Sequence, residues 1–176
     1  MLRKVLLEGA HSLRVNCLPM TFEEVLEKLQ AHGEVIDDLL WDMKETMLHA
    51  QGVGLAANQI GLEVALFILK DDALTAGYME YISPTIINAE ELVDFENEGC
   101  LSVPGVSGTT KRYNKIRLTY QVRNGMFLIE EFTGQKAFAV QHEMDHLSGK
   151  LYIDQFGPVR KSMLLKKHKK FVRGQR

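Results

Sequence analysis

The sequence predicts an α+β fold, a single domain of antiparallel β-strands around a central helix that carries an H-E-x-x-H pattern. Three observations predict it: helical patterns lie at both ends of the chain, β-rich runs lie between them, and a helical pattern at 134–148 follows the strands. The chain has 176 residues and a mass of 20.0 kDa, which suits one domain with a sizeable core. We expect this domain to span residues 1–176.

Two helices are expected in the N-terminal part. The first begins after Thr21, because Thr21 and Glu24 form a capping-box pattern, and it runs to about Gly33. The second ends near Gly52 and carries apolar residues at helical spacing, which we interpret as core rather than as a functional surface. These apolar residues are Ile36, Leu39, Leu40, Met43 and Met47.

Strands are expected next, at residues 63–69, 81–89 and 115–133. The run EVALFIL (63–69) is typical of a buried strand, and Pro84 marks an edge or a bend in the second run. Residues 115–133 contain two β-rich runs joined by Asn-Gly at 124–125, which predicts a β-hairpin.

Two more helices are expected in the C-terminal part. The first follows from apolar residues at positions i, i+3, i+7 and i+10, and Gly149 is its expected end. These residues are Ala137, Val140, Met144 and Leu147. The second is a basic amphipathic helix at about 158–173, with an apolar side expected to consist of Val159, Met163, Leu164 and Phe171.

Charge is distributed unevenly along the chain. From Arg160 onward there are eight basic residues and no acidic one. Because the whole chain has a formal net charge of −2, the part before Arg160 carries −10. A basic tail of this kind is typical of a segment that binds nucleic acid or another polyanion, and also of a solvated helix that only keeps a protein soluble. The charge pattern alone leaves both interpretations open.

The composition is that of an ordinary globular chain, with 45% hydrophobic and 25% charged residues. No apolar run is long enough to cross a membrane, and the start of the chain does not have the pattern of a signal peptide. Two cysteines, Cys17 and Cys100, do not make a disulfide framework. We therefore predict a cytoplasmic protein with reduced thiols and no membrane partner.

The stretch QHEMDH (141–146) has the spacing of a metal site. On a helix His142 and His146 lie one turn apart on the same face, so both imidazoles can reach one cation. Glu143 lies beside the first histidine and can act as a general base toward a water molecule. The pattern is short and also occurs by chance, in which case the histidines are ordinary core residues with hydrogen-bond partners.

A catalytic metal site usually has three protein ligands, so a third is needed. Downstream, Asp154 is conceivable, and His168 in the basic tail is a weaker candidate. Upstream, Cys100 lies in the loop NEGCLSVPG (97–105) and can serve as a thiolate ligand. The alternative for Cys100 is a small buried hydrophobic residue, which is our interpretation of Cys17.

A third stretch, GVGLAANQIG (52–61), combines two glycines with a polar amide. Gly52 and Gly54 allow a close backbone approach or a positive φ, and Gln59 stands among small and apolar residues. No Gly-Lys-Ser/Thr follows, so the stretch is not a phosphate-binding loop. It is either a turn that leads into a strand or a backbone-and-amide cradle for a substrate.

Taken together and in this order, the stretches GVGLAANQ (52–59), EGCLS (98–102) and QHEMDH (141–146) resemble the peptide deformylases. The resemblance covers about residues 35–155. It implies an enzyme that removes the formyl group from the N-terminal formyl-methionine of newly synthesised polypeptides. It also implies one divalent metal ion, typically Fe²⁺, with Zn²⁺, Ni²⁺ or Co²⁺ able to substitute.

The resemblance assigns roles to residues. Metal-bound water would attack the formyl carbonyl, with Glu143 as general base and then acid, while the Gln59 amide and the Leu101 N–H would donate to the oxyanion. Glu98 would pair with Arg112 and shape the cysteine loop. The metal ligands would be Cys100, His142 and His146, and the substrate-binding residues Gly54, Leu55, Gly99, Phe138 and Ala139.

The chain departs from its relatives at two places. Ser107 and Gly108 stand where some relatives carry an arginine, and polar Gln135 stands where relatives often have an apolar pocket residue. In some bacterial deformylases a basic C-terminal helix docks on the ribosome, which gives the basic tail of this chain an expected partner.

Two other functions compete with deformylation. A zinc protease with the same H-E-x-x-H would not need Cys100 and would cleave internal peptide bonds. A non-enzymatic relative that only associates with ribosomes or holds a metal would be expected to lack Glu143 or Gln59, and both residues are present.

Overall fold

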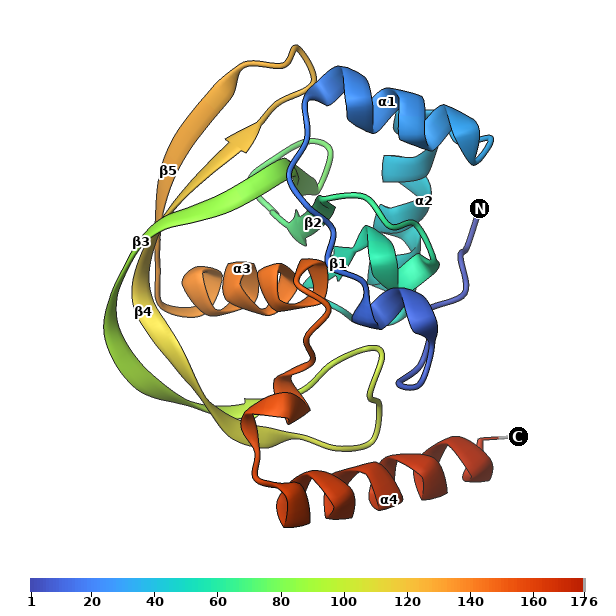
Figure 1. Cartoon of the computed structure of the whole chain (residues 1–176), viewed down its shortest axis with the longest axis vertical. Coiled ribbons are helices and arrows are strands. Elements are labelled where there is room, and N and C mark those ends of the chain that lie inside the picture. Colours follow the sequence, from blue (N-terminus) through green and yellow to red (C-terminus); the bar gives the residue numbers. More distant parts are fainter. Residues whose placement is uncertain (176) are drawn as a thin grey trace.

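The N-terminal part folds into two helices in the computed structural model, which describes residues 1–175. Helix α1 (Phe22–Ala31) has the predicted capping box, because Thr21 and Glu24 each accept a hydrogen bond from the other's backbone N–H. Helix α2 (Ile36–His49) buries its predicted apolar stripe. Both helices lie on the same side of the molecule in Figure 1, and they share a core cluster with the first two strands.

Five antiparallel strands form one sheet in the order β1-β2-β3-β4-β5, which confirms the α+β class. The predicted hairpin joins β4 to β5, and Gly125 in its turn has a φ of +78°. The strands are β1 (Gly54–Ala56), β2 (Leu66–Lys70), β3 (Tyr78–Glu98), β4 (Gly108–Gln121) and β5 (Phe127–Thr133). Short 3₁₀ helices are η1 (His11–Arg14), η2 (Ala57–Ile60) and η3 (Tyr152–Gln155).

Strands β3 and β4 are longer than predicted. The predicted run 81–89 is the middle of a 21-residue strand, and the polar, acidic residues that follow it pair with β4 as far as Glu98 opposite Gly108. Ser83 and Asn97 have positive φ and lie at two register shifts, where β-bulges bend the pair. Figure 1 shows the two strands curving past α3 toward the C-terminal segment. This curvature brings the end of β3 to the site described below.

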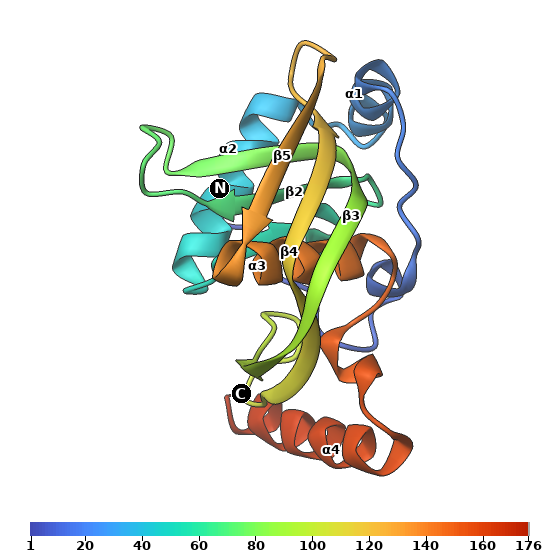
Figure 2. The same cartoon turned by 90° about the vertical axis from the view of Figure 1, so that its left-hand side faces the viewer.

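Helix α3 (Gly134–Leu147) lies inside the curve of β3 and β4 (Figure 1) and behind the strands in Figure 2. Its predicted apolar residues face the sheet: Ala137, Val140 and Leu147 belong to the core cluster formed with β2, β3, β4 and β5. Gly149 follows the helix with a φ of +68°, as expected for a helix end. The helix is therefore fixed on one face by the sheet, and its other face is available for the site.

The C-terminal helix α4 (Pro158–Gly174) lies beyond the lower ends of β3 and β4 in both views (Figures 1 and 2). It contacts η3 and the loop that connects β3 to β4. None of the helices in the described part of the chain is both long and apolar enough to cross a membrane.

The predicted apolar side of α4 is wrong in part. Val159 and Met163 are 76% and 56% exposed, whereas Leu164 packs on a small cluster around Tyr152 and His168 is 3% exposed. The reason is that α4 touches the body of the protein along a narrow line and not over a full amphipathic face. A polar histidine is buried on this line because a carbonyl group lies beside it, which hydrophobic periodicity cannot show.

Asp154 joins the N-terminal part of the chain to the C-terminal helix. Its carboxylate accepts hydrogen bonds from Arg14, from Lys161 of α4 and from the backbone N–H of Leu151. Burial acts to raise the pKa of Asp154, but these partners outweigh burial and lower it. The residue is therefore a structural anchor, and it does not lie with the two histidines of α3.

We expect Asp154→Asn to destabilise the protein at neutral pH but much less in acid. A carboxylate whose pKa is lowered by folding contributes stability above its unfolded pKa of about 3.9, and this contribution is lost as the pH falls through the lower folded pKa. A loss of about 1 kcal/mol would lower Tm by about 2–4 °C at pH 7. Thermal unfolding of the metal-free native and variant proteins at pH 7 and pH 3 tests this, and a difference in Tm that is the same at both values contradicts it.

Candidate active site

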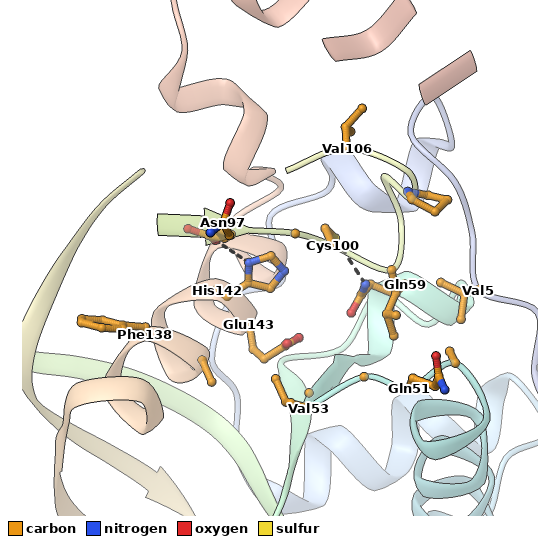
Figure 3. A pocket seen from close by; sticks show the side chains of 18 of the residues that line it. Val5, Gln51, Val53, Gln59, Asn97, Cys100, Val106, Phe138, His142 and Glu143 are labelled. Carbon is orange, nitrogen blue, oxygen red and sulfur yellow. Dashed lines mark hydrogen bonds and ion pairs between the residues drawn. The ribbon is translucent and has the colours of Figure 1, made fainter. Parts of the chain in front are cut away.

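Helix α3 presents three functional side chains on the face that is turned away from the core. His142 and His146 lie one turn apart, with ring centroids 5.0 Å from each other. Glu143 directly follows His142 and is 3% exposed. Its Oε2 has no hydrogen-bond partner within the described part of the chain. In Figure 3 the carboxylate of Glu143 points into the pocket below the His142 ring.

Cys100 meets the two histidines from the loop after β3. Its Sγ lies 3.1 Å from His146 Nε2, and the potential ligand atoms of Cys100, His142 and His146 all lie within 4.8 Å of one another. The other candidates for a third ligand lie elsewhere: Asp154 binds Arg14 and Lys161, and His168 bonds to a backbone carbonyl. The structure therefore brings together a thiol and two imidazoles.

A buried ion-pair network fixes the orientation of His142. Its Nδ1 lies 2.6 Å from Glu98 Oε1, which leaves Nε2 free to face the site. Arg112 forms a two-pronged ion pair with Glu98 and also bonds to Asp145 at 2.6 Å, while Thr110 donates to the same Glu98 carboxylate. A carboxylate that orients a histidine in this way is the usual second partner of a metal-binding imidazole.

Charged partners in the site lower the pKa values of two groups, Glu98 and Cys100. Burial acts to raise the pKa of Glu98, but the hydrogen bonds from His142 and Arg112 outweigh it and lower this pKa to about 2. Burial also opposes ionisation of Cys100, yet His146 and His142 hold the pKa of this thiol well below its ordinary value. The site therefore favours a thiolate, which is the form that binds a metal.

Glu143 shows the opposite shift. Burial raises the pKa of Glu143 to about 7, although the nearby His142 and His146 act to lower it. A carboxyl group with a pKa near neutral pH can both take up and release a proton under physiological conditions.

Gln59 reaches the site from η2, directly after β1. Its Oε1 accepts a hydrogen bond from the Ala56 N–H at 2.9 Å, so its Nε2 is turned toward Ser102 Oγ at 3.1 Å and Cys100 Sγ at 3.9 Å. The backbone N–H of Leu101 makes no hydrogen bond within the described residues. Two donors are therefore available beside Cys100.

Gly52 and Gly54, which precede η2, are needed because other groups come close to their backbone, and neither of them has a positive φ. A Cβ atom on Gly54 would collide with the carboxylate of Glu143, and one on Gly52 would lie 2.8 Å from the Leu101 side chain. Only glycine lets β1 run this close to α3 and to the cysteine loop. The prediction of a close backbone approach at these positions is confirmed.

A cavity of about 570 Å³ opens over these groups. Figure 3 shows Val53, Gln59, Cys100, His142 and Glu143 arranged around it. Among the predicted substrate-binding residues, Gly54, Gly99, Phe138 and Ala139 line this cavity. Leu55 does not: its side chain is fully buried in the core cluster that includes residues of α2, so the expectation that Leu55 binds the substrate now concerns only its backbone and stays a prediction.

Several lining residues were not predicted. Phe95 packs against Phe138 with ring centroids 4.8 Å apart and ring planes tilted by 35°, and both residues line the cavity. Ser102, which orients Gln59, was also not predicted; it is fully buried and does not itself line the cavity. Ser102 stands inside the EGCLS stretch and could have been noted there, whereas the position of Phe95 follows only from the unpredicted half of β3. The remaining unpredicted lining residues are Val5, Ala50, Gln51, Val53, Asn97, Pro104, Gly105 and Val106.

The donor set fits a divalent metal ion. One thiolate and two imidazoles are ligands that Zn²⁺ and Fe²⁺ both accept, and three protein ligands leave a position open for chemistry. The unpartnered Oε2 of Glu143 supports this assignment, because a buried carboxylate oxygen normally has a partner and here it faces the cavity.

Comparisons with known proteins agree with this site. The family model for polypeptide deformylase matches residues 3–162. A peptide deformylase of Chlorobium phaeovibrioides is 39% identical over 148 residues, which cover 78% of this chain and 77% of that protein. The crystal structure of a peptide deformylase from Legionella pneumophila superposes with a TM-score of 0.85 at 34% identity and covers 99% of this chain and 98% of that one.

A second crystal structure, of the peptide deformylase from Thermotoga maritima, has a TM-score of 0.74 at 34% identity and covers 90% of this chain and 99% of that one. The family match extends over most of the chain and includes all three stretches that carry the site. The chain therefore belongs to the polypeptide deformylase family, hydrolases that remove the N-formyl group from nascent peptides.

Proposed function

We propose that this enzyme hydrolyses the formyl group of formyl-methionyl peptides with Cys100, His142 and His146 as metal ligands and Glu143 as the proton-transfer group. One observation carries the proposal: a buried carboxylate with an unpartnered oxygen lies beside a Cys-His-His cluster and faces a cavity large enough for a peptide end. When bound, the metal polarises a carbonyl group and lowers the pKa of a water molecule.

We assign the native metal as Fe²⁺, with Zn²⁺, Ni²⁺ or Co²⁺ as substitutes. The donor set of one thiolate and two imidazoles supports all four ions, and the choice of Fe²⁺ as the native one rests on the family resemblance. Glu98 keeps His142 in the orientation that leaves Nε2 free, and Arg112 holds Glu98 in turn. The chain therefore supplies a pre-oriented ligand set.

Glu143 takes a proton from the attacking water and delivers it to the leaving amine. Its raised pKa suits both steps, because a group with a pKa near the working pH gives up and accepts a proton with similar ease. Gly54 has no side chain and so lets the substrate and the Glu143 carboxylate come close to the same stretch of backbone.

Gln59 Nε2 and the Leu101 N–H donate to the oxygen on which negative charge develops. Both lie beside Cys100, and Ala56 and Ser102 hold the Gln59 amide in place before the substrate arrives. Donors that are fixed in advance stabilise the transition state without any cost of reorganisation. Phe138 and Ala139 form the apolar part of the cavity and receive the methionine side chain.

We expect Gln59→Leu to lower kcat by about 10²–10³-fold, which is typical for the loss of one oxyanion donor. The metal content should stay at the native level, because Gln59 is not a ligand in this proposal. Steady-state kinetics together with elemental analysis of the purified variant test this. Native kcat in a metal-loaded variant would remove Gln59 from the mechanism.

The test of the reaction is formate release from a formyl-Met-Ala-Ser peptide by protein purified without oxygen and supplied with Fe²⁺. Release that stops when a chelator is added is the expected result. A protein that holds one metal ion and releases no formate would overturn the proposal. Cleavage of an internal bond in an unformylated peptide would instead favour the zinc-protease alternative.

We further propose that the exposed basic face of α4 binds the ribosome, in the cytoplasm where nascent chains carry a formyl group. The support is the charge and exposure of the helix: it carries exposed basic residues on a segment that lies beyond the lower ends of β3 and β4 (Figure 1). These residues are Arg160, Lys166, Lys167, Lys169, Lys170 and Arg173. Clustered positive charge of this kind suits the phosphate backbone of RNA.

We expect Lys166→Glu with Lys170→Glu to weaken co-sedimentation with ribosomes by about 10-fold or more and to reduce its salt dependence. Formate release from a free peptide should remain at the native level. The matched control is Lys4→Glu with Lys150→Glu, which makes the same change in net charge on exposed lysines outside α4. Equal loss of binding in both double variants would mean that net charge alone, and not α4, is responsible.

A further inference from the structure

One wall of the cavity is formed by three residues of the loop between β3 and β4: Pro104, Gly105 and Val106. The same three residues contact the C-terminal segment, which consists of η3 and α4. We propose that His168 of α4 and Tyr152 of η3 are positioning residues that hold this wall in the shape that binds the peptide substrate. The inference rests on the proposed function, because it concerns the same substrate cavity. It extends that function to a helix with no side chain in the cavity.

His168 carries the first part of the argument. It is 3% exposed, and its Nδ1 lies 3.0 Å from the backbone oxygen of Pro104. A carbonyl oxygen only accepts hydrogen bonds, so Nδ1 is the donor. The mechanism does not use this histidine, and it lies away from the metal cluster. A buried imidazole on an otherwise basic, solvated helix is explained by the loop carbonyl that it binds.

The next two loop residues are held in the same way. Gly105 has a φ of +81°, and a Cβ atom there would collide with the ring of Phe171, so the helix packs directly on the loop backbone. The carbonyl of Val106 accepts a hydrogen bond from the Tyr152 hydroxyl at 3.1 Å. Three consecutive wall residues are thus each contacted by a different side chain of the C-terminal segment.

Residues 104–107 of the loop need this support because they make no backbone–backbone hydrogen bond within the described part of the chain. Residues 99–107 lie between β3 and β4 without strand pairing, and the carbonyls of Pro104 and Val106 bond to side chains. The Val106 oxygen also lies 3.8 Å from the position that a Cβ on Gly99 would occupy, next to Cys100. Figure 3 shows Val106 on the opposite side of Cys100 from Glu143. Loosening the loop therefore loosens one wall of the cavity.

A looser wall affects substrate binding and not the chemical step. The substrate would have to order the loop when it binds, which reduces its affinity. Glu143, Gln59 and the two histidine ligands are fixed by α3, η2 and the Glu98 network, none of which depends on His168. Cys100 lies in the same loop, but the fully buried Ser102 and Val103 separate it from Pro104 and hold its position. We therefore expect a raised KM with an unchanged kcat, which is the pattern seen when the bound substrate and the transition state lose the same amount of binding energy.

The test compares His168→Leu and Tyr152→Phe with the native enzyme. Each substitution removes one hydrogen bond, and Tyr152→Phe keeps the buried ring, so it carries the test even if His168→Leu fails to fold. We expect KM for formyl-Met-Ala-Ser, and Kd for the product peptide Met-Ala-Ser measured by calorimetry, to rise about 3–10-fold. We expect kcat and metal content to stay at the native level.

Two controls make the result specific. His168→Asn offers an amide donor close to the Nδ1 position and should restore native KM, while Ser162→Ala changes an exposed residue of the same helix and should have no effect. Native turnover with unchanged KM in both His168→Leu and Tyr152→Phe overturns this inference and leaves the proposed function intact. A native protein without turnover overturns the proposed function and this inference with it.

Discussion

Replacing Glu143 by glutamine should lower kcat for formate release by about 10²–10⁴-fold, the usual contribution of a general acid–base group. Glutamine has nearly the same shape as glutamate but cannot take a proton from water at neutral pH. The position is buried against Gly54, so an isosteric change is the one that the site tolerates. The measurement is steady-state turnover of formyl-Met-Ala-Ser, with elemental analysis of the same preparation.

The metal content decides how a loss of activity is interpreted. Glu143 is not one of the three clustered ligands, so Glu143→Gln should hold the same amount of metal as the native protein. Glu27→Gln, a change at an exposed carboxylate of α1, is the matched control and should have native activity. A metal-loaded Glu143→Gln enzyme with native kcat would show that another group transfers the proton.

The sequence predicted the part of the site that depends on local geometry. His142, Glu143 and His146 share a helix, and the spacing of residues along a helix determines which side chains share a face. The capping box at Thr21 and the Asn-Gly turn at 124–125 are local in the same sense, and the structure confirms both. Neighbouring residues alone specify these features.

The features that were not predicted depend on parts of the chain that are far apart in sequence. The second half of β3 has a polar, acidic sequence, and it forms a strand because β4 pairs with it. Its bulges then bring Phe95 and Asn97 to the cavity. His168 is buried because Pro104 lies beside it, although the basic sequence around His168 indicates a solvated helix.

The three-motif resemblance supplied what spacing could not. From the residues alone, Asp154, His168 and Cys100 were all open as a third ligand. The structure shows that Asp154 and His168 have other partners: Asp154 bonds to Arg14 and Lys161, and His168 bonds to the carbonyl of Pro104. Both therefore have structural reasons to be present that are independent of the metal.

Replacing Cys100 by alanine should remove the metal from the enzyme. Removing a carboxylate that hydrogen-bonds to a ligating histidine typically lowers metal affinity about 10–100-fold, or about 1–3 kcal/mol. The loss of metal affinity in Cys100→Ala should be larger, because a ligand itself is removed. Two imidazoles alone would remain, and few sites hold a catalytic metal with two protein ligands. Elemental analysis after dialysis, and competition with a chromogenic chelator, measure the change.

The chain offers its own internal comparisons for this experiment. Cys17→Ala removes the other free thiol, which is 5% exposed in the core and is not part of the cluster, and it should leave the metal content unchanged. Glu98→Gln keeps all three ligands but weakens the support of His142, so its metal affinity should lie between those of the native protein and Cys100→Ala. Metal affinity falls in the order native protein, Glu98→Gln, Cys100→Ala only if the Cys100 thiolate binds the metal directly. If Cys100→Ala kept one tightly bound metal ion, the third ligand would be another group, and cleavage of internal peptide bonds would again have to be tested.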